Sequence, residues 1–257
     1  MKKILVATLL LAMMILAGCG GEQSAKKIII GIDDDFAPIS FYNEENELVG
    51  FDVDLAKETC ERMGVLAEFK PISWDKKREE ILSGGVDIIW DGLDITEDRK
   101  EYMIFSKPYM DDRQVMLVKK GYDKNIHSEG DLAGKVVGAQ SGSTAENYIN
   151  NNQELRDTVK DLKVYSKFQE GINGLENSDI EVFICDELVA RYKVNKNPDQ
   201  LEIIDVKTGS AIEVGIGFHK ENVELRNKVQ EAFDEMIKDG TAKKISEKWF
   251  NADLIKQ

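Results

Sequence analysis

The sequence predicts an α/β fold with two lobes, each built around a central sheet. Apolar strand-like runs alternate with amphipathic helical stretches along the body of the chain, which is typical of α/β layers with a largely parallel sheet. The alternation falls into two groups of similar size, with no Pro/Ser-rich linker between them. A body of about 230 residues has room for two such units. We therefore expect two lobes joined by extended crossovers.

The first group of elements begins with the run 28–32, which is continuously apolar, as in a strand buried on both faces. Thr96 has acidic residues directly after it and is expected to cap the start of a helix. The other elements expected here are a helix capped by Asp52 and ending near Gly64, a helix over 74–82 and a strand over 86–90.

The second group repeats the pattern, and Ser143 and Glu146 have the spacing of a helix capping box. Strands are expected over 135–139, 163–165, 181–185 and 214–218, and helices after Ser143, over 168–176, over 221–238 and up to Phe250. In open α/β sheets, ligands bind beyond the carboxyl ends of the strands. A crevice is therefore expected where strand ends place Asp33, Asp91-Gly92, Ser141-Gly142 and Asp186.

The N-terminus predicts a targeting segment. Lys2 and Lys3 precede an uncharged apolar run over 4–17. Its length of about 14 residues is short of the roughly 20 that a permanent membrane helix needs, which indicates a signal peptide.

The run ends in Leu-Ala-Gly-Cys at 16–19, which resembles a bacterial lipobox. In lipoproteins with this motif the cysteine, here Cys19, carries diacylglycerol on its sulfur and usually an acyl chain such as palmitate on its amine. We interpret 1–18 as a signal peptide and 19–27 as a lipidated cysteine and tether, which would anchor the protein to a membrane. The alternative is a cysteine that happens to follow a cleaved signal.

The charge and the cysteines exclude several function classes. The formal net charge is −14, and it becomes −16 without Lys2 and Lys3, so nucleic acid, which is bound through basic groups, is not an expected partner. Cys60 and Cys185 lie in separate expected elements and are predicted to be free thiols. Neither histidine has the spacing of a metal or nucleophile motif, so we expect no metal and no cofactor.

Seven short segments carry a family resemblance. They are 31–38 (GIDDDFAP), 49–56 (VGFDVDLA), 73–75 (SWD), 91–99 (DGLDITEDR), 105–109 (FSKPY), 138–144 (GAQSGST) and 239–250 (DGTAKKISEKWF). Each alone is a weak signal, but together they cover nearly the whole body. In this order they resemble family 3 of the extracellular solute-binding proteins, the polar amino-acid receptors of ABC importers.

The resemblance implies a type II periplasmic-binding-protein-like fold with two hinge crossovers. Lobe 1 would consist of 28–112 with 214–257, and lobe 2 of 113–213. It also implies an extracytoplasmic monomer, which the lipobox-like motif would anchor to the membrane through lipid. Its partners would be a small-molecule amino acid and the ABC permease subunits in the membrane.

The resemblance assigns the ligand's α-carboxylate to Arg99 and Thr144. A planar guanidinium can bind a carboxylate through two parallel hydrogen bonds, and a place in the first turn of a helix would add backbone amides and the helix dipole. Thr144 begins a helix in the second lobe, whose amides suit the same anion. The alternatives are a solvated Arg99 paired with Glu97 or Asp98, and a plain helix cap at Thr144.

Asp186 matches the family position that receives the α-ammonium, and Gly92 the position whose backbone contacts the head group, where glycine leaves room. Phe36 and Trp74 match the aromatic pair that sandwiches the ligand's side chain, and aromatic faces also attract cations. Ordinary core packing is the alternative for both rings. The role of Trp90 stays open.

Three further aspartates favour a cationic ligand. Asp33 and Asp91 match positions that contact the side chain in family members selective for basic amino acids, and Asp94 replaces the usual serine or threonine. Three carboxylates in one crevice would repel each other unless a cation enters or a proton stays bound. We expect lysine, arginine or ornithine. A diamine is the alternative, and Asp34 and Asp35 could be surface charge.

Two other functions on the same fold stay open at this point. A small branch of the fold is a cyclohexadienyl dehydratase, in which Asp94 could be imagined as a general acid. A sensory domain would need a separate signalling partner, because the chain carries no further membrane helix or signalling module. We expect no enzyme activity.

Overall fold

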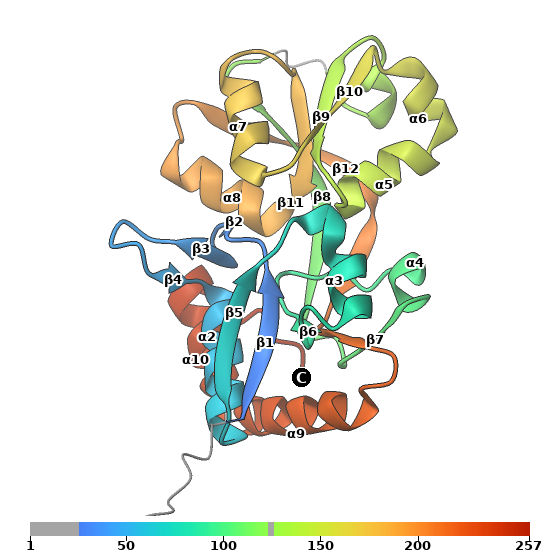
Figure 1. The fold of residues 1–257 in the computed structure, drawn as a ribbon. Coiled ribbons are helices and arrows are strands. Elements are labelled where there is room, and N and C mark those ends of the chain that lie inside the picture. The colour runs from blue at the N-terminus through green and yellow to red at the C-terminus, as the bar shows by residue number, and fades with distance from the viewer. Residues whose placement is uncertain (1–25, 123–125) are drawn as a thin grey trace, which may run out of the picture.

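The computed structural model describes residues 26–122 and 126–257, so the expected signal peptide, Cys19 and most of the tether lie outside the described residues. Two five-stranded sheets lie one above the other and define two lobes (Figure 1). Within the described ranges, no helix combines the length and the hydropathy that crossing a membrane requires.

The sheet of the first lobe has the strand order β5-β1-β6-β13-β7. These strands are β1 (Lys27–Ile32), β5 (Leu66–Pro71), β6 (Ile88–Ile89), β7 (Met103–Phe105) and β13 (Gly217–His219). β1 runs parallel to β5 and β6, whereas β13 is antiparallel to its neighbours. Ile30 and Ile32 are completely buried, as expected for a strand covered on both faces. The helices of this lobe are α2 (Phe51–Arg62), the 3₁₀ helix η1 (Trp74–Lys76), α3 (Lys77–Ser83), α4 (Glu97–Lys100), α9 (Val223–Asp239) and α10 (Thr241–Phe250).

The sheet of the second lobe has the order β10-β9-β11-β8-β12. These strands are β8 (Met110–Lys119), β9 (Val136–Gln140), β10 (Asp161–Tyr165), β11 (Val182–Asp186) and β12 (Leu201–Val214). β9 runs parallel to β10 and β11, and β8 is antiparallel to β11 and β12. The helices are the 3₁₀ helix η2 (Glu129–Leu132), α5 (Thr144–Asn151), α6 (Gln153–Thr158), α7 (Phe168–Glu176) and α8 (Glu187–Lys196).

The long strands β8 and β12 connect the lobes (Figure 1). Their register pairs Met110 with Val214 and Asp112 with Ile212. The sequence predicted neither strand as such. Its expected strand over 214–218 is confirmed only in part, because β12 ends at Val214 and a separate strand, β13, begins at Gly217. The crossovers are therefore paired strands, which hold the two sheets in a defined relation.

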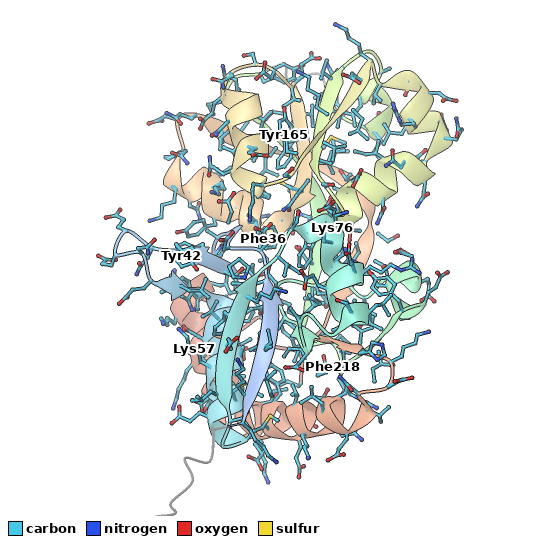
Figure 2. The ribbon with its side chains drawn as sticks, in the orientation of Figure 1. Phe36, Tyr42, Lys57, Lys76, Tyr165 and Phe218 are labelled. Carbon is cyan, nitrogen blue, oxygen red and sulfur yellow. The ribbon has the colours of Figure 1, made fainter. Side chains whose placement is uncertain are left out.

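A small third sheet, β2 (Asp35–Phe36), β3 (Ser40–Tyr42) and β4 (Leu48–Val49), lies beside the first lobe near the boundary. Figure 2 shows Phe218 inside the first lobe, Tyr165 inside the second, and Phe36 where the lobes meet. Cys60 in α2 and Cys185 in β11 are both free and buried. The boundary between the lobes thus contains the aromatic side chain of Phe36, which belongs to the short strand β2 that follows β1 in the chain.

Candidate ligand-binding site

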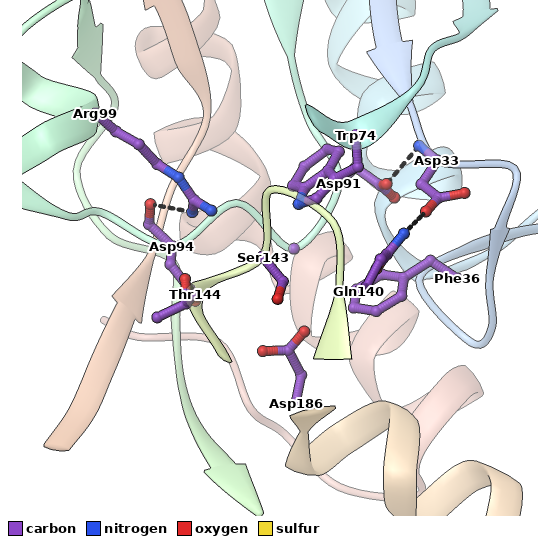
Figure 3. A pocket seen from close by; sticks show the side chains of 11 residues that line it. Asp33, Phe36, Trp74, Asp91, Asp94, Arg99, Gln140, Ser143, Thr144 and Asp186 are labelled. Carbon is purple, nitrogen blue, oxygen red and sulfur yellow. Dashed lines mark hydrogen bonds between the residues drawn. The ribbon is translucent and has the colours of Figure 1, made fainter. Parts of the chain in front are cut away.

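A small cavity lies between the two lobes, and eleven residues line it (Figure 3). They are Asp33, Phe36, Trp74, Asp91, Gly92, Asp94 and Arg99 from the first lobe and Gln140, Ser143, Thr144 and Asp186 from the second. The nine residues that the sequence singled out for a ligand all lie on its wall. Asp33 follows β1, and β9 and β11 end at Gln140 and Asp186, so the cavity occupies the carboxyl ends of the strands.

The guanidinium of Arg99 is buried without a carboxylate partner. The side chain is 2% exposed; Nη1 donates to the carbonyl oxygen of Asp94 at 2.8 Å, and Nη2 makes a longer bond of 3.5 Å to that of Gly142 in the other lobe. No ion pair within 4.0 Å joins Arg99 to a carboxylate in the described ranges. A buried cation is costly unless an anion joins it, so this end of the cavity is suited to an anionic group.

The helix around Arg99 differs from the expectation. α4 consists of Glu97–Lys100 alone, a single turn, so it has little dipole to add. Thr96 does cap it, accepting from the backbone N–H of Arg99 at 3.4 Å. Because Arg99 is buried and Glu97 pairs with Lys100 on the surface, the alternative of a solvated Arg99 paired with Glu97 or Asp98 is wrong.

Three carboxyl groups gather at the same end of the cavity. One oxygen of Asp94 accepts from the hydroxyl of Thr144, across the cleft, and its Oδ1 is buried without a partner in the described structure. Gln114 donates to Asp186 at 2.5 Å. Burial, followed by repulsion from Asp94, raises the pKa of Asp186 to about 7. Burial, followed by repulsion from Asp186, raises the pKa of Asp112 well above its usual range. A cation placed among these groups would relieve the repulsion.

Asp33 and Asp91 lie on the wall at the other end, and both have protein partners. Asp91 accepts from the backbone N–H of Asp33 at 2.6 Å and from the hydroxyl of Ser40. Burial, followed by repulsion from Asp33, raises the pKa of Asp91 well above its usual range. Asp33 accepts from the amide of Gln140 and, at 3.2 Å, from the ammonium of Lys167, both in the second lobe.

Two aromatic rings, Phe36 and Trp74, complete the wall (Figure 3). Phe36 also meets Phe168 of the second lobe edge to face, with 5.7 Å between the ring centroids. Trp90 is not part of the lining, because its ring packs against Phe233 in the core of the first lobe. The structure therefore separates one core tryptophan from one cavity tryptophan.

A buried carboxyl group, that of Asp52, holds part of the cavity wall in place. Asp52 accepts from the backbone N–H of Gly92 at 2.6 Å and from the hydroxyl of Tyr109 at 2.8 and 2.9 Å. Burial raises the pKa of Asp52 to about 7. The expected role of Asp52 as a helix cap is wrong, because α2 already begins at Phe51. Asp52 instead fixes the loop at Gly92, whose φ of +55° favours glycine.

A buried lysine joins the two lobes beside the cavity. Lys77 donates to the carbonyl oxygen of Trp74 at 2.9 Å and to that of Gly142 at 2.6 Å. Burial, followed by repulsion from Arg99, lowers the pKa of Lys77 to about 7. At Gly142, φ is +70° and an added Cβ would lie 2.7 Å from Cα of Asp75. These contacts bring the lobes together in a closed arrangement.

Sequence reasoning missed four residues at or beside the site: Gln140, Ser143, Asp112 and Lys77. Gln140 and Ser143 lie within the segment 138–144, and Gln140 ends a strand, so the strand-end argument could have included them. Ser143 caps α5 by accepting from the N–H of Glu146 at 3.0 Å, but the Glu146 carboxylate binds the N–H of Gly142, so half of the expected capping box forms. Asp112 and Lys77 gave no signal.

Comparisons with known proteins agree with this geometry. A model of the bacterial extracellular solute-binding proteins, family 3, matches residues 28–252. The L-cystine-binding protein TcyJ of Escherichia coli strain K12 is 32% identical over 232 residues, covering 89% of this chain and 84% of that protein. A substrate-binding protein of an ABC uptake transporter from Streptococcus pneumoniae, solved with bound histidine, has a TM-score of 0.85 at 33% identity, covering 90% of this chain and 95% of that one.

An ancestral arginine-binding protein, solved with glutamine and with arginine, is 38% identical. The TM-scores are 0.81 and 0.82, and the matches cover 87% of this chain and 97% and 98% of those chains. The expected two-lobe α/β fold is confirmed. The matching family and these relatives are solute-binding proteins and not enzymes, so the dehydratase alternative is set aside.

Proposed function

Because the chain belongs to family 3 of the bacterial extracellular solute-binding proteins, we propose that it is the receptor of an ABC importer for a polar amino acid, with lysine, arginine or ornithine as the favoured ligands. One observation carries the proposal: among the described residues, buried Arg99 makes no ion pair within 4.0 Å, and at the same end of the cavity Oδ1 of Asp94 has no donor and the pKa of Asp186 is raised to about 7. An α-amino acid carries a carboxylate and an ammonium group on one carbon atom, and can therefore offer an anion to Arg99 and a cation to the carboxyl groups at once.

In the proposed complex the ligand's carboxylate lies against Arg99 and the start of α5 at Thr144. A guanidinium holds a carboxylate through two parallel hydrogen bonds, and the first amides of α5 add donors from the second lobe. The ligand's ammonium lies between Asp94 and Asp186, where it gives Oδ1 of Asp94 the partner that it lacks. Gly92 leaves room for the head group.

The preference for a cationic side chain is supported by the other end of the cavity. Asp33 and Asp91 supply negative charge there, and Phe36 and Trp74 supply ring faces that attract cations. The relatives compared above include proteins whose names give arginine or histidine as ligands.

We further propose that binding closes a hinge. Lobe 1, residues 28–112 with 214–257, and lobe 2, residues 113–213, would move relative to each other about β8 and β12. A ligand that touches both lobes binds the closed form more tightly, and this difference in affinity is sufficient to drive closure. The permease subunits would recognise the closed form.

The receptor is proposed to work as an extracytoplasmic monomer held to the membrane by lipid on Cys19. The support is the lipobox-like end of the apolar run and the polar tether after it. Replacing Cys19 with alanine should release the protein from the membrane fraction. Unchanged membrane association would contradict lipid anchoring while leaving the binding function intact.

The test of function is calorimetric titration of residues 27–257 against the twenty amino acids, ornithine, cystine and a set of diamines. We expect saturable binding of at least one cationic amino acid. Asp33→Asn should weaken lysine and arginine more than glutamine, because only the first two carry a charge toward that carboxylate. An equal loss of affinity for all ligands would contradict a preference for cationic amino acids. The absence of binding to any amino acid would contradict the proposed function.

A further inference from the structure

The first turn of α7 in the second lobe faces three consecutive aspartates of the first lobe. The ammonium of Lys167, directly before α7, lies 2.6 Å from Oδ1 of Asp34 and 3.2 Å from Oδ1 of Asp33. The backbone N–H of Gln169 donates to Asp35 at 2.8 Å. Asp34 and Asp35 are therefore contacts between the lobes and not simply surface charge. Figure 1 shows α7 above β2 at this boundary.

Asp33 is the one member of this acidic run that also lines the cavity. Its side chain is 3% exposed, and both oxygens are engaged. Oδ2 accepts from Gln140, and Oδ1 accepts from Lys167 and from the backbone N–H of Asp35 at 3.1 Å. Lys167 is the group with a full positive charge among these partners. Closure of the cleft thus buries a carboxylate with a cation that the protein itself provides.

The two partners of this ion pair differ in their freedom to leave it. The side chain of Lys167 is 37% exposed and is also paired with Asp34, whose side chain is 26% exposed. Burial lowers the pKa of Lys167, but the hydrogen bonds and charges of Asp34 and Asp33 outweigh this effect and raise it, so the ammonium stays charged. Lys167 can release Asp33 and keep Asp34, whereas Asp33 has no route to water.

We propose that Lys167 is a specificity-determining residue: it supplies the positive charge that Asp33 needs when the ligand's side chain has none, and it withdraws to Asp34 when a ligand brings its own cation. This inference rests on the proposed function and deepens it. The pocket can then close on neutral polar amino acids as well as on cationic ones. Without Lys167, closure on a neutral ligand would bury Asp33 with no cation, which is a strongly unfavourable arrangement.

The test compares glutamine and arginine by calorimetric titration of the purified protein and its Lys167→Met variant. We expect the Kd for glutamine to rise by about tenfold or more, because an uncompensated buried charge costs more than 1.4 kcal/mol. The Kd for arginine should change by less than about threefold or fall, because the guanidinium replaces the lost ammonium. Lys167→Arg retains the charge and should retain glutamine binding.

Asp35→Ala is the matched control, because it removes a contact between the same two segments without touching the cavity. It should weaken glutamine and arginine by similar factors. If Lys167→Met also weakens glutamine and arginine by similar factors, Lys167 only holds the lobes together and the proposal is overturned. The proposal is also overturned if neither Kd changes in Lys167→Met, or if the unaltered protein binds arginine but not glutamine. An unaltered protein that binds no amino acid would overturn the proposed function itself, and this inference with it.

Discussion

Replacing Arg99 with alanine is expected to raise the Kd of every α-amino acid by at least two orders of magnitude. The side chain is 2% exposed in the closed structure, so its bonds to a ligand's carboxylate would be shielded from water. Charge-assisted hydrogen bonds contribute about 1.5–3 kcal/mol each, so two contribute about 3–6 kcal/mol. At about 1.4 kcal/mol per factor of ten, the loss corresponds to roughly 10²- to 10⁴-fold in Kd.

Calorimetric titration measures this change, and thermal unfolding without ligand checks the fold. We expect the unliganded Tm to stay close to that of the unaltered protein, because within the described ranges Arg99 makes no ion pair shorter than 4.0 Å and its hydrogen bonds go to backbone carbonyl oxygens. Arg78→Ala is the control, since Arg78 lies over the ring of Tyr102 at 4.9 Å, outside the cavity lining. A folded Arg99→Ala variant whose Kd stays within about threefold of the unaltered protein would remove Arg99 from the site.

Four other outcomes are expected. Gly142→Ala should raise the Kd of all ligands by about tenfold or more, because φ is +70° and the new Cβ would lie 2.7 Å from Cα of Asp75 in the other lobe. Calorimetric titration measures the Kd, and an unchanged value would mean that the two lobes do not approach each other at Gly142 when ligand binds. Tyr109→Phe should lower the free energy of unfolding by about 1–3 kcal/mol in urea melts, since it removes a donor from buried Asp52, while Tyr42→Phe, at an exposed ring, should not. Burial within the first lobe raises the pKa of Asp52 to about 7, above the unfolded value of 3.8, so the native protein binds more protons than the unfolded one. Asp52 should therefore make the unliganded Tm fall as pH rises from 5 to 7. Ligand affinity should rise over the same range, because the ligand's ammonium favours ionised Asp186; a Kd that does not change with pH would contradict that pairing.

Much of the site could be located from the sequence, because strand ends in an α/β fold are set by local patterns. The apolar run 28–32 predicts where the first strand ends and therefore places Asp33 at its carboxyl end. In the second lobe, the apolar residues before Asp186 place that aspartate at the carboxyl end of a strand. Ser143 has the chemistry of a helix cap, which places Thr144 at the start of α5. These positions depend on short segments, and the structure brings them to one cavity.

The features that the sequence did not predict depend on contacts between distant segments. β8 carries charged residues at 111–113 and pairs with β12, which lies far along the chain. The charged residues interrupt the alternation of polar and apolar side chains by which a strand is recognised, and the distant partner gives no local signal. Asp52 has the spacing of a helix cap, but tertiary contacts with Gly92 and Tyr109 take its carboxylate instead. Lys167 has no motif at all, and only the closed packing of the lobes brings it to Asp33.

The same atoms account for recognition and for closure. In a closed cavity without ligand, the described residues give Arg99 no ion pair within 4.0 Å and give Oδ1 of Asp94 no donor, and opening the cleft would hydrate both. A ligand that lacks either charge leaves one of these buried groups unpaired, at a cost of about 1–3 kcal/mol or more for a charged group. A diamine supplies cations but no carboxylate, so it cannot satisfy Arg99. The diamine alternative, which the acidic run left open, is therefore disfavoured by the buried guanidinium. In the proposed binding mode, a ligand must carry an anion and a cation on the same carbon atom before the lobes can close on it without leaving a buried group unpaired.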